Sequence, residues 1–307
     1  MGFAFAFALV PLYNVFCEVT GINGKVFQSE ENDKLVITNG RDLSLQFIST
    51  NNEMMPWVFK PSEEVMKIKK CGNIISEVHS ILGKLVEPGI STWELDKVAE
   101  DYTVSKGYVP AFKGYQNFPG SICASINHEV VHGIPSKNII LKKGDIIGID
   151  FGVYKDGFYA DSAFTFGVGN IGSDLELLLD VTRDSLAKGI ENAVIGNKLY
   201  DISKSIQDHV ENNGFSIVRS YVGHGIGRNL HEDPQVPNFV LESEKRENSL
   251  DLVEGLVIAI EPMVNVGNYE VEVSNDNWTV VTKDGSLSAH FEHTIAITKK
   301  GPVNLTK

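Results

Sequence analysis

The sequence predicts an α+β protein in which the order helix, helix, strands occurs twice. Two pairs of segments have apolar residues at steps of three and four, and a β-rich region follows each pair. The stretch GISTWELDKV in the first pair is echoed by GNKLYDISKS in the second. Such a duplication would set two half-domains back to back, with residues of their strands facing a common centre.

The first pair of helices is expected directly after residue 61. An N-cap at Ser62 and a stop at Pro88-Gly89 bound the first helix, and Ser91-x-x-Glu94 forms a capping box for the second, which ends near Lys106, before a glycine. The first helix should bury one apolar face, formed by Ile68, Cys71, Ile75, Val78, Leu82 and Leu85.

The second pair of helices follows the same rules. Ser173-x-x-Glu176 predicts a cap for a helix that runs to about Asn192, and a fourth helix is expected from Leu199 to Asn213, before a glycine. The strands of the two halves are expected near residues 120–131, 145–166, 216–224, 256–264 and 278–298.

Residues 1–60 differ from the rest and are expected to be a separate fragment, with the main domain at 61–307. Gly2 to Cys17 (GFAFAFALVPLYNVFC) is apolar but shorter than the about 20 residues of a spanning helix, which leaves a truncated membrane anchor or a buried or disordered tail. Beyond it, short alternating runs flank Asn39-Gly40, a dipeptide typical of a tight hairpin.

Composition limits the classes of partner. The net charge of -13 argues against a duplex nucleic-acid binder, which needs a basic face, and it suits a site built from carboxylates. The three cysteines lie far apart without a CxxC pair, so a disulfide framework is not supported and a reducing compartment is the simplest interpretation.

Asp150 and Asp161 lie on two β-rich runs joined by the turn sequence Lys155-Asp156-Gly157. A hairpin symmetric about that turn would set the two carboxylates opposite each other, with Cβ atoms about 5 Å apart. Such a pair repels unless a cation lies between them. The alternative is that both side chains lie on a solvated face.

Two histidines lie in the glycine-rich segment YVGHGIGRNLHEDPQV. His224 stands between Gly223 and Gly225, and His231 follows seven residues later. Glycines let the backbone approach a ligand closely, and imidazole both binds metals and transfers protons near neutral pH. The segment therefore predicts a site, although a single histidine is more often structural.

Glu261 in GLVIAIEPM and Glu292 in SAHFEHTIAIT interrupt strongly apolar strands. A buried carboxylate needs a partner, and no basic residue lies near either glutamate in sequence, so metal ligation is favoured over a salt bridge. With Asp150, Asp161 and His224 they carry a formal charge of -4, which two divalent cations would balance. Such ligands suit manganese, iron(II), cobalt or zinc, and a pair of these metals suits peptide hydrolysis.

From Pro61 to Lys307 the chain resembles the type I methionine aminopeptidases. The motifs ASINHEVVHGIP, GDIIGIDFGVYKDGFYADS, GHGIGRNLHEDP, IEPM and FEHT occur in order. The resemblance implies the pita-bread fold, a curved antiparallel sheet covered by helices with pseudo-two-fold symmetry. It also implies removal of an initiator methionine that precedes a small residue.

The resemblance also implies roles for individual residues. Asp150, Asp161, His224, Glu261 and Glu292 become metal ligands, with Asp161 and Glu292 bridging, and Glu261 accepts the proton of the attacking water. The histidines of VHGIP and LHEDP, His132 and His231, would hold the substrate, with His231 donating to the oxyanion and His132 near the scissile nitrogen. The methionine pocket would contain Tyr115, Phe118, Cys123, Leu230 and Trp278, residues that by pattern alone would be ordinary core.

The pocket departs from the commonest bacterial pattern of this family at two positions. Gln116 and Leu230 stand where a histidine and a phenylalanine are frequent, and these departures bear on the shape of the pocket and hence on its side-chain preference. The segment between His224 and Glu261 lacks the helical insertion of type II enzymes. The resemblance further implies nascent polypeptides at the ribosome as substrates, a cytoplasmic monomer, and no direct nucleic-acid or membrane partner.

Two alternatives from other classes remain open. An Xaa-Pro dipeptidase or aminopeptidase would use the same five ligands, but its large N-terminal domain is not expected from 60 residues. A non-catalytic binding protein of this fold would be expected to lack metal ligands, and all five are present.

The front of the chain resembles a second family over positions 9–61. PLYNVFCEVTG and PWVFKP are similar to the start of the copper-delivery assembly factors of cytochrome oxidase. The cysteine pair with which that family binds copper is absent, so no copper function is expected. The join at Pro61 resembles two genes run together.

Overall fold

A computed structural model describes residues 62–307. The apolar start, the Asn39-Gly40 hairpin and the expected boundary at residue 60 lie outside the described residues. Within the described part, none of the helices combines the length and the apolar character needed to cross a bilayer.

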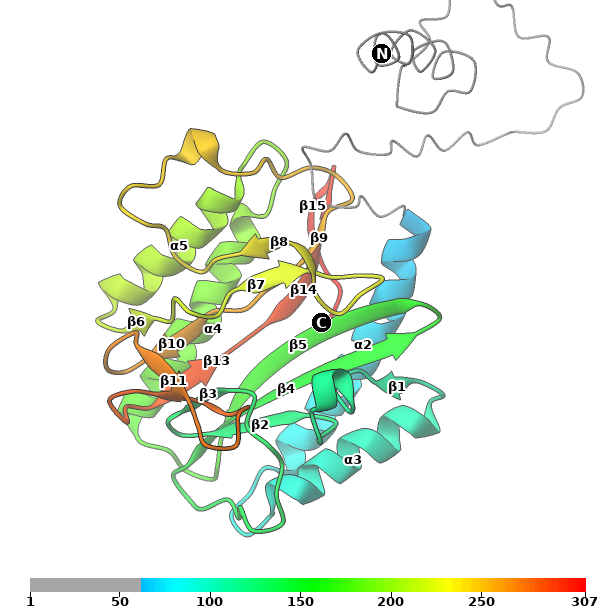
Figure 1. The fold of residues 1–307 in the computed structure, drawn as a ribbon, viewed down its shortest axis with the longest axis vertical. Coiled ribbons are helices and arrows are strands. Elements are labelled where there is room, and N and C mark those ends of the chain that lie inside the picture. Colours follow the sequence, from blue (N-terminus) through cyan, green and yellow to red (C-terminus); the bar gives the residue numbers. More distant parts are fainter. Residues whose placement is uncertain (1–61) are drawn as a thin grey trace, which may run out of the picture. The chain divides into compact units, whose positions relative to one another are not determined.

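The predicted order of helix, helix and strands is present in both halves, as Figure 1 shows. Helices α2 (Ser62–Leu85) and α3 (Thr92–Ser105) open the first half, and α4 (Ser173–Asn192) and α5 (Leu199–Asn212) open the second. The first half continues with β1 (Val109–Pro110), the 3-10 turn η1 (Tyr115–Asn117), β2 (Cys123–Ile126), β3 (Glu129–Val131), β4 (Ile146–Lys155) and β5 (Phe158–Gly167).

The second half contributes shorter strands. They are β6 (Ser216–Ile217), β7 (Gly223–Gly225), β8 (Glu232–Val236), β9 (Val257–Ile260), β10 (Met263–Asn265), β11 (Val271–Val273), β12 (Val280–Thr282), β13 (Ser288–His290), β14 (His293–Thr298) and β15 (Gly301–Asn304), with a 3-10 turn η2 (Arg246–Asn248). Within residues 62–307 the named strands pair antiparallel, and the largest sheet has the order β15-β14-β9-β7-β8. The α+β prediction is therefore confirmed.

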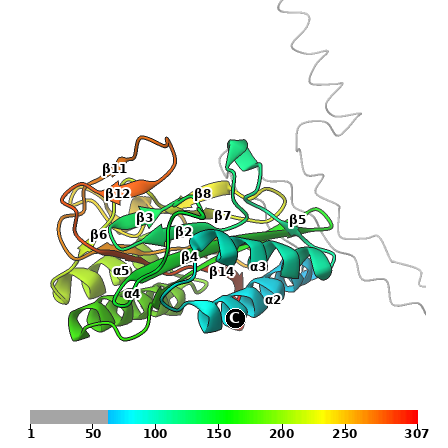
Figure 2. The ribbon, with the colours of Figure 1, turned by 90° about the horizontal axis from the view of Figure 1, so that it is seen from below.

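Helices cover one side of the strands. Figure 2 shows α2, α4 and α5 on the same side, and α2 packs on β4 and β5 while α4 packs on β9, β10 and β13. β4 explains the arrangement, because its alternate residues Ile147, Ile149, Phe151 and Val153 are buried in the core that also contains the apolar face of α2. The other face of β4 carries Asp150, which is left free to face the centre of the molecule.

The register of the β4–β5 hairpin differs from the prediction. Asp150 pairs with Ala163, and Asp161 pairs with Gly152, so the two carboxylates are diagonal neighbours on one face rather than directly opposed. The reason is the turn, in which only Asp156 and its following glycine are unpaired and both have positive φ. Such a two-residue turn keeps Lys155 in the strand and shifts the pairing.

Capping confirms one helix start and corrects another. Ser91 accepts a hydrogen bond from the backbone N–H of Glu94, and the Glu94 carboxylate accepts one from the N–H of Ser91, as the capping box predicts. The predicted box at Ser173 is wrong. Gly172 is the N-cap of α4, and no side chain caps that end, because Ser173 is already the first helical residue.

Hydroxyl groups join the two halves along β5. Ser162 Oγ donates to the carbonyl of Glu292 at 2.6 Å, and Thr165 Oγ1 donates to the carbonyl of His290 at 2.7 Å. Thr294 Oγ1 donates to the carbonyl of Asp161 at 2.8 Å and accepts from its N–H at 3.0 Å. These bonds fix β5 against the segment before β14 and so position two predicted ligands, Asp161 and Glu292.

Candidate active site

A pocket of about 220 Å³ lies where the two halves meet. All twelve residues predicted for the site line it, and they come from both halves of the chain. The lining residues are Phe112, Tyr115, Gln116, Phe118, Cys123, His132, Asp150, Asp161, His224, Leu230, His231, Glu261, Trp278 and Glu292.

Four carboxylates converge in this pocket without cationic partners. Asp161 and Glu292 are 4% and 2% exposed, and among the described residues no lysine or arginine pairs with them or with Asp150 and Glu261. Burial raises the pKa of Asp161 to about 7 and raises the pKa values of the other three well above their usual range, with neighbouring carboxylates adding to the effect for each of these three. The cluster is therefore costly to ionise without a cation.

His224 completes the cluster from β7. A Cβ on Gly223 would lie 2.3 Å from the carbonyl oxygen of Ala259, and one on Gly225 would lie 2.2 Å from that of Asp233, so both flanking positions need glycine. His224 Nδ1 donates to the carbonyl of Gly225 at 2.9 Å, which leaves Nε2 unprotonated and 3.7 Å from Glu261 Oε1.

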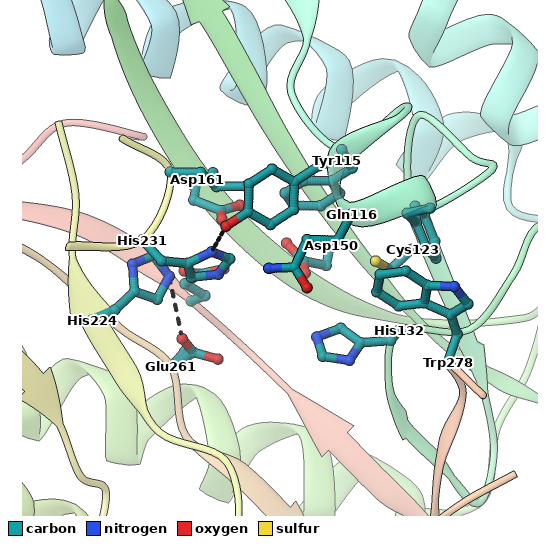
Figure 3. A pocket seen from close by; sticks show the side chains of 14 residues that line it. Tyr115, Gln116, Cys123, His132, Asp150, Asp161, His224, His231, Glu261 and Trp278 are labelled. Carbon is teal, nitrogen blue, oxygen red and sulfur yellow. Dashed lines mark hydrogen bonds and ion pairs between the residues drawn. The ribbon is translucent and has the colours of Figure 1, made fainter. Parts of the chain in front are cut away.

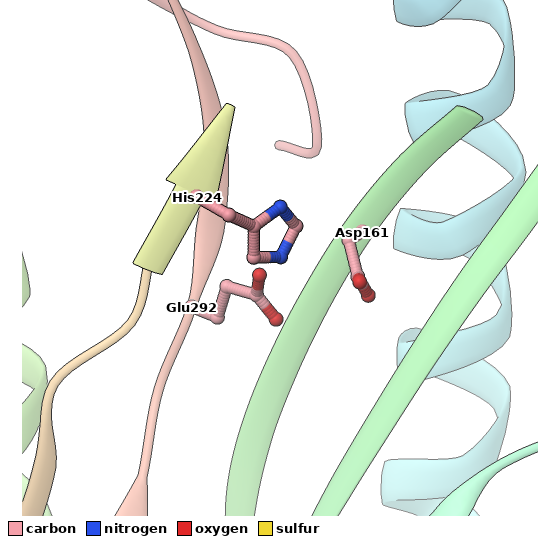
Figure 4. Close-up of side chains that lie close together, drawn as sticks. All are labelled: Asp161, His224 and Glu292. Atoms are coloured by element: carbon pink, nitrogen blue, oxygen red, sulfur yellow. The ribbon is translucent and has the colours of Figure 1, made fainter. Parts of the chain in front are cut away.

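The residues fit a bound metal. Ligand atoms of Asp161, His224 and Glu292 lie within 4.8 Å of one another, and Figure 4 shows the three side chains converging. Oδ1 of Asp150, Oδ1 of Asp161 and Oε1 of Glu292 are buried without hydrogen-bond partners. Unpaired buried carboxylate oxygens beside an unprotonated imidazole nitrogen are a donor set that suits a divalent cation.

His231 and Tyr115 form the wall beside the carboxylates. The hydroxyl of Tyr115 lies 2.9 Å from Nδ1 of His231, and the ring of His231 lies 4.4 Å from that of His224, as Figure 3 shows. Burial lowers the pKa of His231, so this imidazole is neutral near pH 7. A Tyr115 hydroxyl that donates to Nδ1 leaves the proton of His231 on Nε2.

His132 faces the same pocket from the residue after β3. Its φ of 62° is in the left-handed region, where a non-glycine residue is strained, and such strain is concentrated at functional sites. Its ring packs edge-on against Tyr221 and Trp278. Burial lowers the pKa of His132 to about 4, so it is neutral as well.

Apolar side chains form the other wall. The rings of Phe118 and Trp278 meet edge to face at 5.1 Å, and Leu230 is 2% exposed. Burial raises the pKa of the Cys123 thiol well above its usual range, so it contributes a neutral, polarisable surface rather than a nucleophile.

Three residues of this region were not predicted for the site. Phe112 and Gln116 line the pocket, and His290 Nε2 lies 3.7 Å from Glu261 Oε2 behind it. Phe112 precedes η1, where no periodic pattern exists, and Gln116 had been noted only as a departure from a family pattern. His290 lies two residues before Glu292, a spacing that could have drawn attention to it.

A two-half α+β fold whose centre gathers four carboxylates and an imidazole is typical of metal-dependent hydrolases. The family model "Metallopeptidase family M24" matches residues 66–299. The chain belongs to this family. A second model, "Cytochrome c oxidase assembly protein CtaG/Cox11", matches residues 9–81 and thus overlaps the beginning of the first match.

Similarity to known proteins supports membership of this family. A methionine aminopeptidase of Clostridium acetobutylicum is 49% identical over 81% of this chain and 98% of its own length. The crystal structure of a methionine aminopeptidase from Thermotoga maritima has a TM-score of 0.79 at 42% identity and covers 82% of this chain and 100% of that one. An Xaa-Pro dipeptidase from Bacillus anthracis shares the fold, with a TM-score of 0.63 at 20% identity over 81% of this chain and 62% of that one. The pita-bread fold is therefore confirmed.

Proposed function

We propose that residues 61–307 form a metal-dependent aminopeptidase domain that removes the N-terminal methionine of nascent polypeptides when the second residue is small. The observation that carries the proposal is the combination of an acidic cluster and an apolar pocket in one cavity, in a chain that is 49% identical to a methionine aminopeptidase over 98% of that enzyme. The two parts suit divalent cations and an apolar side chain respectively.

Methionine fits the apolar wall of this pocket. Tyr115, Phe118, Cys123, Leu230 and Trp278 present aromatic and sulfur surfaces that contact a thioether favourably. A volume of about 220 Å³ is smaller than the roughly 300–1,000 Å³ of drug-sized ligand pockets, so it suits a single residue. A bulky second residue would collide with the rim.

Asp150, Asp161, His224, Glu261 and Glu292 would hold two divalent cations. The cluster's formal charge of -4 supports two cations rather than one, and its oxygen-rich donors suit cobalt, manganese, iron(II) or zinc. When bound, such a pair polarises the scissile carbonyl and makes water a stronger nucleophile.

The protein's own groups would then carry the protons. Glu261 accepts the proton of the attacking water. When the Tyr115 hydroxyl donates to Nδ1 of neutral His231, the imidazole presents Nε2–H as a donor to the oxyanion of the tetrahedral intermediate. His132, which is held in the left-handed region and lies across the pocket from His231, would contact the scissile nitrogen.

The alternatives have weaker support. The dipeptidase from Bacillus anthracis is only 20% identical to this chain, against 42% for the Thermotoga maritima enzyme. A non-catalytic binding protein would not need a buried acidic cluster, which is costly to maintain without cations.

The proposal also covers the source of the substrate, the compartment and the partners of the protein. The protein would act as a cytoplasmic monomer on nascent chains at the ribosome. Its net charge of -13 argues against direct contact with nucleic acid. For the segment that matches the CtaG/Cox11 family, we infer no copper-delivery role, because the cysteines at 17, 71 and 123 include no closely spaced pair.

The test is hydrolysis of Met-Ala-Ser and of an Ala-Pro peptide by metal-stripped protein reloaded with manganese or cobalt. Release of methionine alone, dependent on metal and lost in Asp161→Ala, is the expected result. Cleavage of the Ala-Pro peptide instead would move the chain to the Xaa-Pro enzymes, and full metal binding without any hydrolysis would favour the binding protein.

A further inference from the structure

A second cavity of about 700 Å³ lies on the helix-covered side of β5 and β14, between α2 and α4. We call it the rear cleft and define it by its lining from α2, β5, α4 and residues 291–307. The pocket of about 220 Å³ described above is called the front pocket, and none of the residues that line the rear cleft lines it. Its volume is in the range of sites for small organic molecules.

The floor of the rear cleft is aromatic. The ring of Phe164 lies 4.6 Å from that of Phe166 and 4.7 Å from that of Phe291, and all three line the cleft. Leu186 and Ile190 of α4 extend this apolar surface. Clustered aromatic rings favour another flat ring, through offset or edge-to-face contacts.

Imidazole nitrogens give the cleft polar positions. His293 Nδ1 lies 2.8 Å from Thr306 Oγ1, which lies 3.3 Å from Asn304 Oδ1, so the His293 tautomer that carries its proton on Nδ1 lets Thr306 donate to Asn304. Nε2 of His293 is then an acceptor, and it has no partner among the described residues. His79 Nε2 donates to the carbonyl of Ser162 at 2.9 Å, and His79 Nδ1, which is buried without a partner, is a further acceptor beside the cleft.

The rear cleft and the acidic cluster lie on opposite faces of the same two chain segments. Asp161 and Glu292 face the front pocket, while the next residues, Ser162 and His293, line the rear cleft. Side chains alternate between the two faces of a strand. Ser162 Oγ also donates to the carbonyl of Glu292, so residues of the cleft share and link the backbone segments that carry both carboxylates.

We propose that the rear cleft binds a small aromatic molecule that has one N–H or O–H group at its edge, and that its occupancy changes the metal affinity of the front pocket. The ring would pack on Phe164, Phe166 and Phe291, and the edge group would donate to His293 Nε2. The proposal does not depend on methionine specificity, because it concerns binding at both sites rather than hydrolysis.

Indole is the probe, titrated into the full chain by calorimetry. We expect saturable binding with a dissociation constant on the order of 0.1–1 mM, typical of a fragment-sized ligand. Ala187→Trp on α4 and Ser80→Trp on α2 would fill the cleft from opposite walls, and both residues are exposed, so the fold should tolerate them. Leu177→Trp is the matched control, because it is exposed on α4 but does not line the cleft.

Binding should be retained in the Leu177→Trp control and weaken at least about tenfold in both filled variants. Manganese titrations of the wild-type protein should then shift at least about threefold in affinity when indole is saturating, with no shift in Ala187→Trp. Absence of saturable binding, binding in the two filled variants as tight as in the wild-type protein, or unchanged manganese affinity with indole bound would each overturn the proposal. Calorimetry reports these results even for a protein without aminopeptidase activity, so failure of the proposed function would be separately visible.

Discussion

Single side chains in the front pocket are divided between those suited to hold cations and those suited to move protons. The carboxylates have raised pKa values because they are buried together, whereas burial lowers the pKa values of His132 and His231 and keeps both neutral. A neutral imidazole can donate one hydrogen bond without repelling a nearby cation. The two histidines can therefore donate to a developing oxyanion beside bound cations.

Replacement of His231 by alanine should separate these roles. We expect kcat for Met-Ala-Ser to fall by roughly 10²–10³, the usual effect of losing one oxyanion donor, while two equivalents of metal stay bound. Steady-state kinetics and metal analysis of the purified variant measure both quantities. His209→Ala is the control, since this histidine of α5 does not line the pocket. Loss of metal from His231→Ala would contradict the assignment.

Tyr115→Phe should have a smaller effect of the same kind. The change removes the hydroxyl that faces His231 Nδ1 but keeps the ring in the methionine pocket. A net hydrogen-bond contribution of about 1 kcal/mol corresponds to roughly a fivefold lower kcat, with KM nearly unchanged. Tyr154→Phe, outside the pocket, serves as control. A change confined to KM would mean that Tyr115 only binds substrate.

The ligand cluster could be predicted from sequence because its residues are out of place in their segments. Glu261 follows the apolar run VIAI and Glu292 precedes the strand HTIAIT. A carboxylate in such a segment is buried and therefore needs a charged or metal partner. Phe112 gave no such signal, since an aromatic residue before an irregular turn is ordinary core. Its place in the pocket depends on the path of the η1 loop, in which Gln116 and Asn117 both have positive φ.

Hydrophobic periodicity predicted the helices. It did not predict the β4–β5 register or the N-cap of α4, because both depend on local backbone geometry. The register of β4 and β5 depends on positive φ at Asp156 and Gly157, and that conformation adds Lys155 to the strand. The start of α4 depends on Gly172, a cap without a side chain. Both errors are small in sequence, but a shift in register decides which side chains are neighbours.

The fit of α2 against the C-terminal segment leads to a stability prediction. A Cβ on Gly72 would lie 1.9 Å from the carbonyl oxygen of Leu305, which is backbone and cannot rotate away. Gly72→Ala should therefore lower the free energy of unfolding by about 1–3 kcal/mol, although alanine favours helices by about 1 kcal/mol. Urea denaturation measures the difference. Asn73→Ala, at an exposed position of the same helix, should change stability by less than about 0.5 kcal/mol, and an equal effect in both variants would contradict the steric argument.

For the whole molecule, the acidic cluster links stability to pH and to metal. Burial raises the pKa of Asp161 to about 7 and raises those of Asp150, Glu261 and Glu292 well above their usual range, while carboxyl groups of an unfolded chain ionise near pH 4. The folded protein therefore binds more protons than the unfolded chain at neutral pH. The stability that this cluster contributes is fully present below about pH 4 and is lost as the pH rises through 7 and above.

Metal removal should reveal this linkage. Between pH 6.5 and 8.5 the buried histidines add little, because burial lowers the pKa values of His224 and His290 to about 3 and unfolded histidines titrate near 6.5. We expect the Tm of EDTA-treated protein to fall by at least about 5 °C over this range, and the fall to be much smaller with saturating manganese, which binds the ionised cluster. Asp161→Asn, which removes one of the ionising groups, should flatten the metal-free curve. Differential scanning calorimetry provides the comparison, and equal pH dependence with and without manganese would show that the carboxylates are not the metal site.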